Sequence, residues 1–176
     1  MTKFICIIAL SLLTHNVWAQ RSYDFDPLEL DDETKWKEVA TKLPAYPKPE
    51  NAIEFDPGPT TSNRTFIDMS SIGVGTDFVV RFTLIVKSPQ GAVNVSFEGM
   101  RCRTAERKVY GYGRRDGTWG QARNSEWQRV LVNTAQPHYP LLFREYLCAN
   151  RETTFDFRET IAKLKSEGKS VAPGTF

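Results

Sequence analysis

The segment between residues 101 and 129 concentrates side chains that can hold an anion. Basic residues alternate there with aromatic ones: Arg101, Arg103, Arg107, Lys108, Arg114, Arg115, Arg123 and Arg129, with Tyr110, Tyr112, Trp119 and Trp127. Arginine binds phosphate or carboxylate through paired hydrogen bonds, and flat rings stack on bases or sugar faces. The pattern predicts a site for an anionic glycan, a lipid head group or an acidic protein surface. Its expected ligand-binding residues are Arg101, Arg103, Arg114, Arg115, Trp119, Arg123 and Trp127.

An ordinary half-exposed sheet, with arginines alternating against core residues, gives the same pattern and remains the alternative. The formal net charge of +2 favours no class of partner, and we do not expect nucleic acid to be one.

Residues suited to catalysis or metal binding are sparse. His138 is the single histidine after residue 19, and no serine or cysteine nucleophile motif accompanies it. A lone histidine does not make a zinc site, so we predict no catalytic residue, no metal and no cofactor. The rival hypothesis is a small hydrolase of envelope polymers that uses Asp68 and Glu98, and it depends on the separation of the two carboxylates.

The first nineteen residues have the three zones of a secretory signal peptide. Lys3 supplies the positive start, residues 4–13 form an apolar run, and Ala19 is the small residue at the cleavage point. A membrane anchor needs about 20 apolar residues, roughly twice this run, although an uncleaved anchor remains the alternative. We expect cleavage after Ala19 and a soluble periplasmic chain without a later membrane segment.

Removal of the signal peptide takes Cys6 away and leaves Cys102 and Cys148. Two cysteines in an exported chain have one intramolecular pairing, so we predict a structural disulfide. A redox-active or metal-binding pair is the alternative, but redox pairs usually lie close together in the sequence and metal sites need more ligands than two thiols.

From residue 65 onward the apolar residues recur with the period of a β-strand. The clearest strand begins at Phe78 and forms an antiparallel hairpin with the next one. The expected strands lie at residues 66–68, 78–87, 93–97 and 107–114, with a further strand or its remnant near Trp119 and residues 127–132.

Helices are expected at both ends of the chain. Apolar spacing predicts them over residues 33–43, 141–147 and 156–167. Together these strands and helices predict one α+β domain over residues 32–168, with an antiparallel sheet of about four to six strands and flanking N-terminal and C-terminal helices. The remaining segments are an acidic arm at 20–31, a proline-rich connector at 44–59 and a loose tail at 169–176.

Four stretches carry a family resemblance: LPAYPKPEN (43–51), FID (66–68), VNVSFEGMRC (93–102) and DGTW (116–119). They resemble the cryptic neisserial protein family, a group of small exported proteins of proteobacteria without an established activity. The resemblance covers about residues 36–150, and residues 94–102 are its most specific part. It implies a Gram-negative periplasmic location and carries over no catalytic or ligand-binding residue.

Together these observations favour a non-catalytic binding domain for an anionic envelope ligand. The hydrolase is one alternative. The other is an accessory subunit of an envelope complex that docks through the helix around Trp36 or through the acidic arm.

Overall fold

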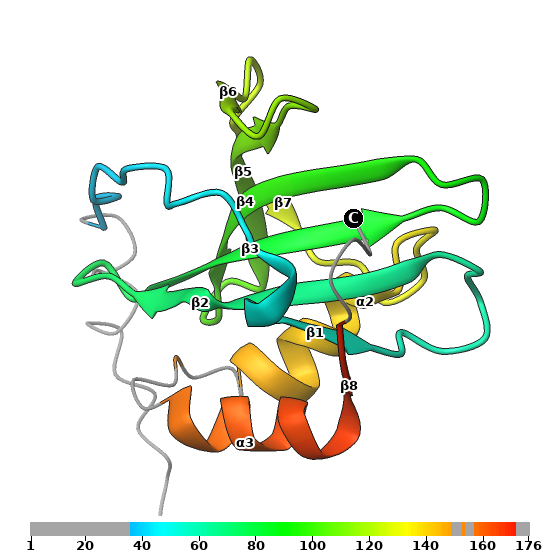
Figure 1. Cartoon of the computed structure of the whole chain (residues 1–176). Helices are drawn as coiled ribbons and strands as arrows, with labels where there is room; N and C mark the ends of the chain where they lie inside the picture. The colour runs from blue at the N-terminus through cyan, green and yellow to red at the C-terminus, as the bar shows by residue number, and fades with distance from the viewer. Residues whose placement is uncertain (1–35, 149–152, 154–156, 172–176) are drawn as a thin grey trace, which may run out of the picture. The chain divides into compact units, whose positions relative to one another are not determined.

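The computed structural model describes residues 36–148, 153 and 157–171, and those from 37 onward belong to one compact unit. The expected signal peptide and acidic arm lie outside the described residues. An antiparallel sheet runs through the unit in the order β6-β5-β4-β3-β2-β1-β8, and β7 pairs with β5 (Figure 1). The strands are β1 (Ala52–Phe55), β2 (Arg64–Val74), β3 (Val79–Lys87), β4 (Val93–Arg101), β5 (Glu106–Gly113), β6 (Trp119–Gln121), β7 (Gln128–Arg129) and β8 (Lys169–Ser170).

The predicted α+β class is confirmed. Within the described residues, five strands of four or more residues form the body of the sheet, and three short ones extend it. The predicted hairpin of β3 and β4 pairs residue for residue from Val79 with Arg101 to Lys87 with Val93. Its turn closes where Gly91 adopts a φ of +88° and donates its N–H to the carbonyl of Ser88.

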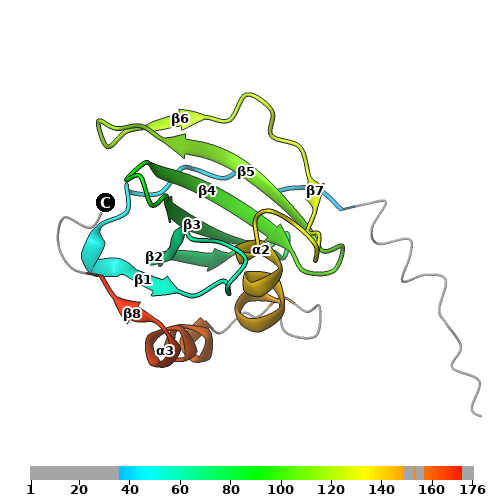
Figure 2. The ribbon, with the colours of Figure 1, turned by 90° about the vertical axis from the view of Figure 1, so that its right-hand side faces the viewer.

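Helices cover one face of this sheet (Figures 1 and 2). They are α2 (His138–Leu141), which continues as the π-helix η2 (Leu142–Leu147), and α3 (Phe157–Glu167). Both were expected, although α2 begins three residues earlier than the sequence indicated. The core between helices and sheet contains Ile53, Phe55, Ile67, Val80, Phe82, Leu84, Met100, Tyr139, Leu142, Tyr146, Leu147 and Leu164.

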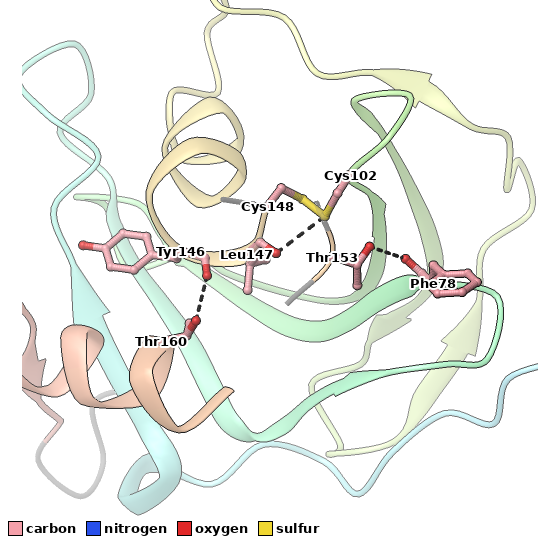
Figure 3. Close-up of a disulfide and its surroundings, with 7 residues drawn as sticks. All are labelled: Phe78, Cys102, Tyr146, Leu147, Cys148, Thr153 and Thr160. Carbon is pink, nitrogen blue, oxygen red and sulfur yellow. Dashed lines mark hydrogen bonds between the residues drawn. A yellow bond between two sulfur atoms is a disulfide. The ribbon is translucent and has the colours of Figure 1, made fainter. Parts of the chain in front are cut away.

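The disulfide that the sequence predicted joins Cys102, just after β4, to Cys148 at the end of η2 (Figure 3). Both residues are 1% exposed, and the Sγ atom of Cys102 lies 3.5 Å from the carbonyl oxygen of Leu147. Nearby, the hydroxyl of Thr160 in α3 donates to the carbonyl of Tyr146 at 2.9 Å. The disulfide ties η2 to the end of β4, and the Thr160 hydrogen bond ties α3 to η2.

The N-terminal helix predicted over residues 33–43 does not form in its described part. Residues 37–48, which we call the strap, run without helix along the face of β4 and β5 opposite α2 (Figure 2). The backbone groups of the strap bind the sheet instead of one another. Val39 donates to Asp77 Oδ2 at 2.8 Å and accepts from Arg81, and the carbonyl of Pro44 accepts the indole N–H of Trp119 at 2.9 Å.

Three further boundaries differ from the prediction. The proline-rich connector contains a 3-10 turn, η1 (Pro49–Asn51), followed by strand β1, which pairs with β2. The first residues of the expected loose tail form β8 because Lys169 and Ser170 pair with β1. Phe78 lies outside β3: it is 58% exposed with a φ of 61°, and its N–H donates to the carbonyl of Gly75 to close the turn.

Within the described residues, each helix is too short or too polar to cross a lipid bilayer.

Candidate functional site

The residues predicted to bind a ligand separate into two groups. Near one end of β5, Arg101 forms an ion pair with Glu106 at 3.1 Å, and its guanidinium lies 5.6 Å from the ring centroid of Trp127. The indole N–H of Trp127 donates to Glu38 Oε2 in the strap at 3.3 Å. Arg103 is exposed beside this group. Trp127 is therefore engaged in holding the strap.

The second group lies beyond the other end of β5. The Arg114 guanidinium donates to the carbonyl of Trp119 at 2.7 Å, and the Trp119 ring packs against Tyr46 with centroids 5.4 Å apart. Arg115 and Arg123 are exposed. The eight residues of β5 span roughly 23 Å at 3.3 Å per residue, so the seven predicted residues do not share one site.

A cavity of about 370 Å³ opens along β5 on the other face of the sheet, which carries the helices. Residues of β3, β4 and β5 form its floor, and the start of α2 closes one side. Its lining comprises Thr61, Asn63, Leu84, Val86, Asn94, Val95, Ser96, Glu98, Arg107, Val109, Tyr112, Gly113, Ala135, Gln136, His138 and Tyr139.

Glu98 is the carboxylate of this cavity. Its side chain is 1% exposed, and its Oε1 atom accepts hydrogen bonds from the hydroxyls of Ser96 and Tyr139, the latter at 3.0 Å. Its Oε2 atom has no hydrogen-bond partner among the described residues and lies 3.9 Å from Nη1 of Arg107. Burial raises the pKa of Glu98 despite these neighbours, because desolvation disfavours the charged form.

Arg107 supplies the positive charge. Its guanidinium lies 3.9 Å from the ring centroid of Tyr139, and Nη2 makes long contacts of 3.4 and 3.3 Å with the amide oxygens of Gln128 and Gln136. A second cavity of about 310 Å³ shares Arg107, Gln136 and Tyr139 with the first. The guanidinium therefore stands where the two cavities meet.

His138 completes the wall as a neutral ring. It is 6% exposed, and its ring centroid lies 4.3 Å from that of Tyr139. Burial, with a smaller contribution from Arg107, lowers the pKa of His138 to about 4. The imidazole is therefore uncharged at neutral pH and can both donate and accept a hydrogen bond.

A β-bulge arranges this site. Phe97 pairs with Gly111 whereas Glu98 pairs with Val109, so Tyr110 is the extra residue on β5. Tyr110 turns to the strap face, where its ring centroid lies 5.7 Å from that of Phe97. The extra residue shifts the alternation, and Tyr112 lines the same cavity as Arg107 and Val109.

Asp68 lies on the opposite face of the sheet from Glu98. It pairs with Thr83, whereas Glu98 pairs with Phe82, and paired residues of antiparallel strands point to the same face. The Oδ1 atom of Asp68 accepts from the N–H and the hydroxyl of Ser70. The carboxylate pair of the hydrolase hypothesis therefore does not form between these two residues.

Sequence reasoning missed the centre of this cavity. Arg107 belonged to the basic segment but not to the seven selected residues, and His138 carried no predicted role. Glu98 appeared only as a partner for Asp68. One signal was present: Glu98 lies two residues before Met100 in a strand, so it shares the face of a core residue.

We expect the two buried acid–base groups to give opposite pH dependences of the free energy of unfolding. The pKa of His138 is 6.5 in the unfolded state and about 4 in the folded state. Up to about 3 kcal/mol of the free energy of unfolding is therefore lost as the pH falls from 6.5 to 4. The raised pKa of Glu98 acts the other way, because its contribution is present below 4.5 and is lost as the pH rises through the folded-state value.

Chemical denaturation between pH 3.5 and 8 measures both effects. His138→Asn should flatten the acid side of the profile, and Glu98→Gln should remove the loss on the alkaline side. Profiles of both variants that run parallel to that of the wild type would contradict the prediction.

Comparison with known proteins identifies the family. A model of the CNP1-like family matches residues 31–165, which is most of the sequence. The chain belongs to the CNP1-like family. Membership agrees with the resemblance seen in the sequence, although the match does not restrict the CNP1-like family to neisserial proteins. No curated protein and no solved structure matches the chain.

Membership of the CNP1-like family assigns no chemistry to the cavity, so its function is argued from geometry. Among the described residues, no group of three His, Cys, Asp or Glu side chains is placed to hold a metal ion.

Proposed function

We propose that this CNP1-like protein is a non-catalytic binding protein of the periplasm that holds the anionic group of an envelope ligand at Arg107. The observation that carries the proposal is the position of the guanidinium. It stands where two cavities meet, and the facing carboxyl group, Glu98, is buried with a raised pKa.

The electrostatics of the pair support anion binding. When Glu98 is protonated, Arg107 keeps a full positive charge beside neutral amides and an aromatic face. A mostly buried cation is costly unless an anion compensates it, and its side chain is only 15% exposed. A ligand anion would supply that compensation through charge-assisted hydrogen bonds.

The periplasmic location is supported by the three-zone pattern of residues 1–19 and by the Cys102–Cys148 disulfide. Disulfides persist in oxidising compartments and are rare in the cytosol.

Isothermal titration calorimetry at pH 5 with acetate, inorganic phosphate and glucuronate tests the proposal. We expect at least one anion to bind and Arg107→Ala to weaken it by 10- to 100-fold, as loss of a charged hydrogen bond of roughly 1.5–3 kcal/mol implies. The matched control is Arg115→Ala, which removes an exposed arginine outside the cavity lining and should leave affinity unchanged. Equal affinities of the two variants, or no binding to wild type, would overturn the proposal.

One observation favours the hydrolase as a second candidate, because a buried glutamate of raised pKa is the usual form of a general acid. Glu98 is, however, the single acidic residue among those that line the cavity. The accessory-subunit hypothesis proposed docking through a helix around Trp36, and residues 37–43 form no helix. Its other docking element, the acidic arm, lies outside the described residues. Co-purification from native membranes would test it.

A further inference from the structure

We infer that the ligand of this cavity is a carboxylated sugar, with its carboxylate on Arg107, its ring against Tyr112 and its hydroxyls on the amide side chains of the wall. The inference rests on the proposed function and deepens it, because it names the chemical class of the ligand.

The charge of the cavity matches a single carboxylate. Arg107 is the one cation among the residues that line the larger cavity, and Glu98 leaves its charge uncompensated when Glu98 is protonated. A phosphate monoester carries about −1.5 to −2 at neutral pH and is usually held by several cations. A carboxylate carries one charge and presents two oxygens to the planar guanidinium, so a single arginine satisfies it.

The polar wall suits hydroxyl groups. Asn63, Asn94 and Gln136 place amides around the cavity, and Thr61 adds a hydroxyl. An amide both donates and accepts hydrogen bonds, as a sugar hydroxyl does. Asn63, Asn94 and Gln136 are exposed to solvent, so a ligand can reach them without rearrangement of the sheet.

An aromatic ring stands among these polar groups. Tyr112 is 53% exposed although it lines the cavity, and the bulge at Tyr110 is what turns it to this face. Exposed rings with a free face stack against the C–H face of a sugar ring. Valine and leucine side chains of the floor extend this apolar surface, namely Leu84, Val86 and Val109.

The second cavity gives the site room for more than one residue. It continues on the other side of Arg107 and includes Val130, Leu131 and Thr134, with the exposed Arg129 as a second cation at its edge. A glycan whose carboxylate sits on Arg107 would place its neighbouring residue there. A disaccharide that contains a uronic acid should therefore bind more tightly than the monosaccharide.

Calorimetry on the full chain at pH 5 with four probes tests the class: glucuronate, glucose, acetate and glucose 6-phosphate. We expect glucuronate to bind more tightly than each of the others. Tyr112→Ala should lower the affinity for glucuronate roughly tenfold and leave the affinity for acetate unchanged, because acetate has no ring to stack on Tyr112. Val93→Ala is the matched control, since Val93 is 39% exposed in β4 and does not line the cavity.

The outcomes separate this inference from the proposed function. If acetate binds as tightly as glucuronate, the ligand is not recognised as a sugar, and the inference is wrong while the proposed anion binding stands. If glucose 6-phosphate binds most tightly of the four probes, the preference for a carboxylate is wrong. Equal affinities for glucose and glucuronate would contradict that preference too. Absence of binding to every anion would overturn the inference and the proposed function together.

Discussion

Replacing Asp77 by alanine lowers the free energy of unfolding by roughly 3–5 kcal/mol, because it leaves the charge of Arg81 buried without its partner. The Asp77 side chain is fully buried and that of Arg81 is 9% exposed, and they meet through two contacts of 2.7 and 3.0 Å. Asp77 also accepts the N–H of Val39 from the strap. The substitution therefore loosens the turn before β3 and the strap at once.

Guanidinium denaturation of three variants measures how much the Asp77–Arg81 ion pair contributes to the free energy of unfolding. The double variant Asp77→Ala with Arg81→Met removes both charges and should recover part of the loss. Glu54→Gln is the control, because it breaks the more exposed ion pair with Arg64 and should cost under about 1 kcal/mol. A loss for Asp77→Ala as small as that of Glu54→Gln would show that the buried pair is not a stability determinant.

Removal of the disulfide should cost about 4 kcal/mol. Cys102 and Cys148 close a loop with a sequence separation of 46, and the loss of that constraint increases the entropy of the unfolded chain. The double variant Cys102→Ala with Cys148→Ala should unfold at lower denaturant concentration by this amount.

Reductant provides the internal control for the same experiment. It should lower the stability of wild type toward that of the double variant and leave the double variant unaffected. Unreduced mass spectrometry should find the two cysteines linked. Two free thiols, or equal stability of wild type and double variant, would contradict the prediction.

Local sequence patterns predicted the elements that depend on their own residues. Period-two alternation of apolar residues in the sequence identified β3, β4 and β5, although β3 is buried on both faces from Val79 to Ile85. The sequence predicted a helix over residues 156–167, and α3 spans Phe157–Glu167. The disulfide followed from the small number of cysteines, which left one pairing.

Elements that depend on distant partners were not predictable. The apolar stripe of the strap fits a helix equally well, and only the bonds from Asp77, Arg81 and Trp119 favour the extended form. Likewise β8 exists because β1 offers a free edge to residues 169 and 170. Tertiary contacts outweighed local propensity in both places.

The cavity could not be predicted from the sequence for a related reason. Glu98, Arg107 and His138 come from β4, β5 and α2, and a register shift of one residue decides which side chains of β5 face it. Neither the bulge nor the burial of Glu98 has a signature in composition. Sequence reasoning therefore selected the basic and aromatic segment that contains β5, but it chose neighbours of Arg107 and not Arg107 itself.

The pairing of β8 with β1 joins segments that are synthesised far apart in time. Ile53 and Ser170 are 117 positions apart in the chain, and Leu164 adds a fully buried side chain to the same core. Contacts so distant in sequence form late, because the entropy of closing the loop opposes them until the partners exist. Leu164 can therefore complete this core, and β8 can cover the edge of β1, only after nearly the whole chain has been synthesised.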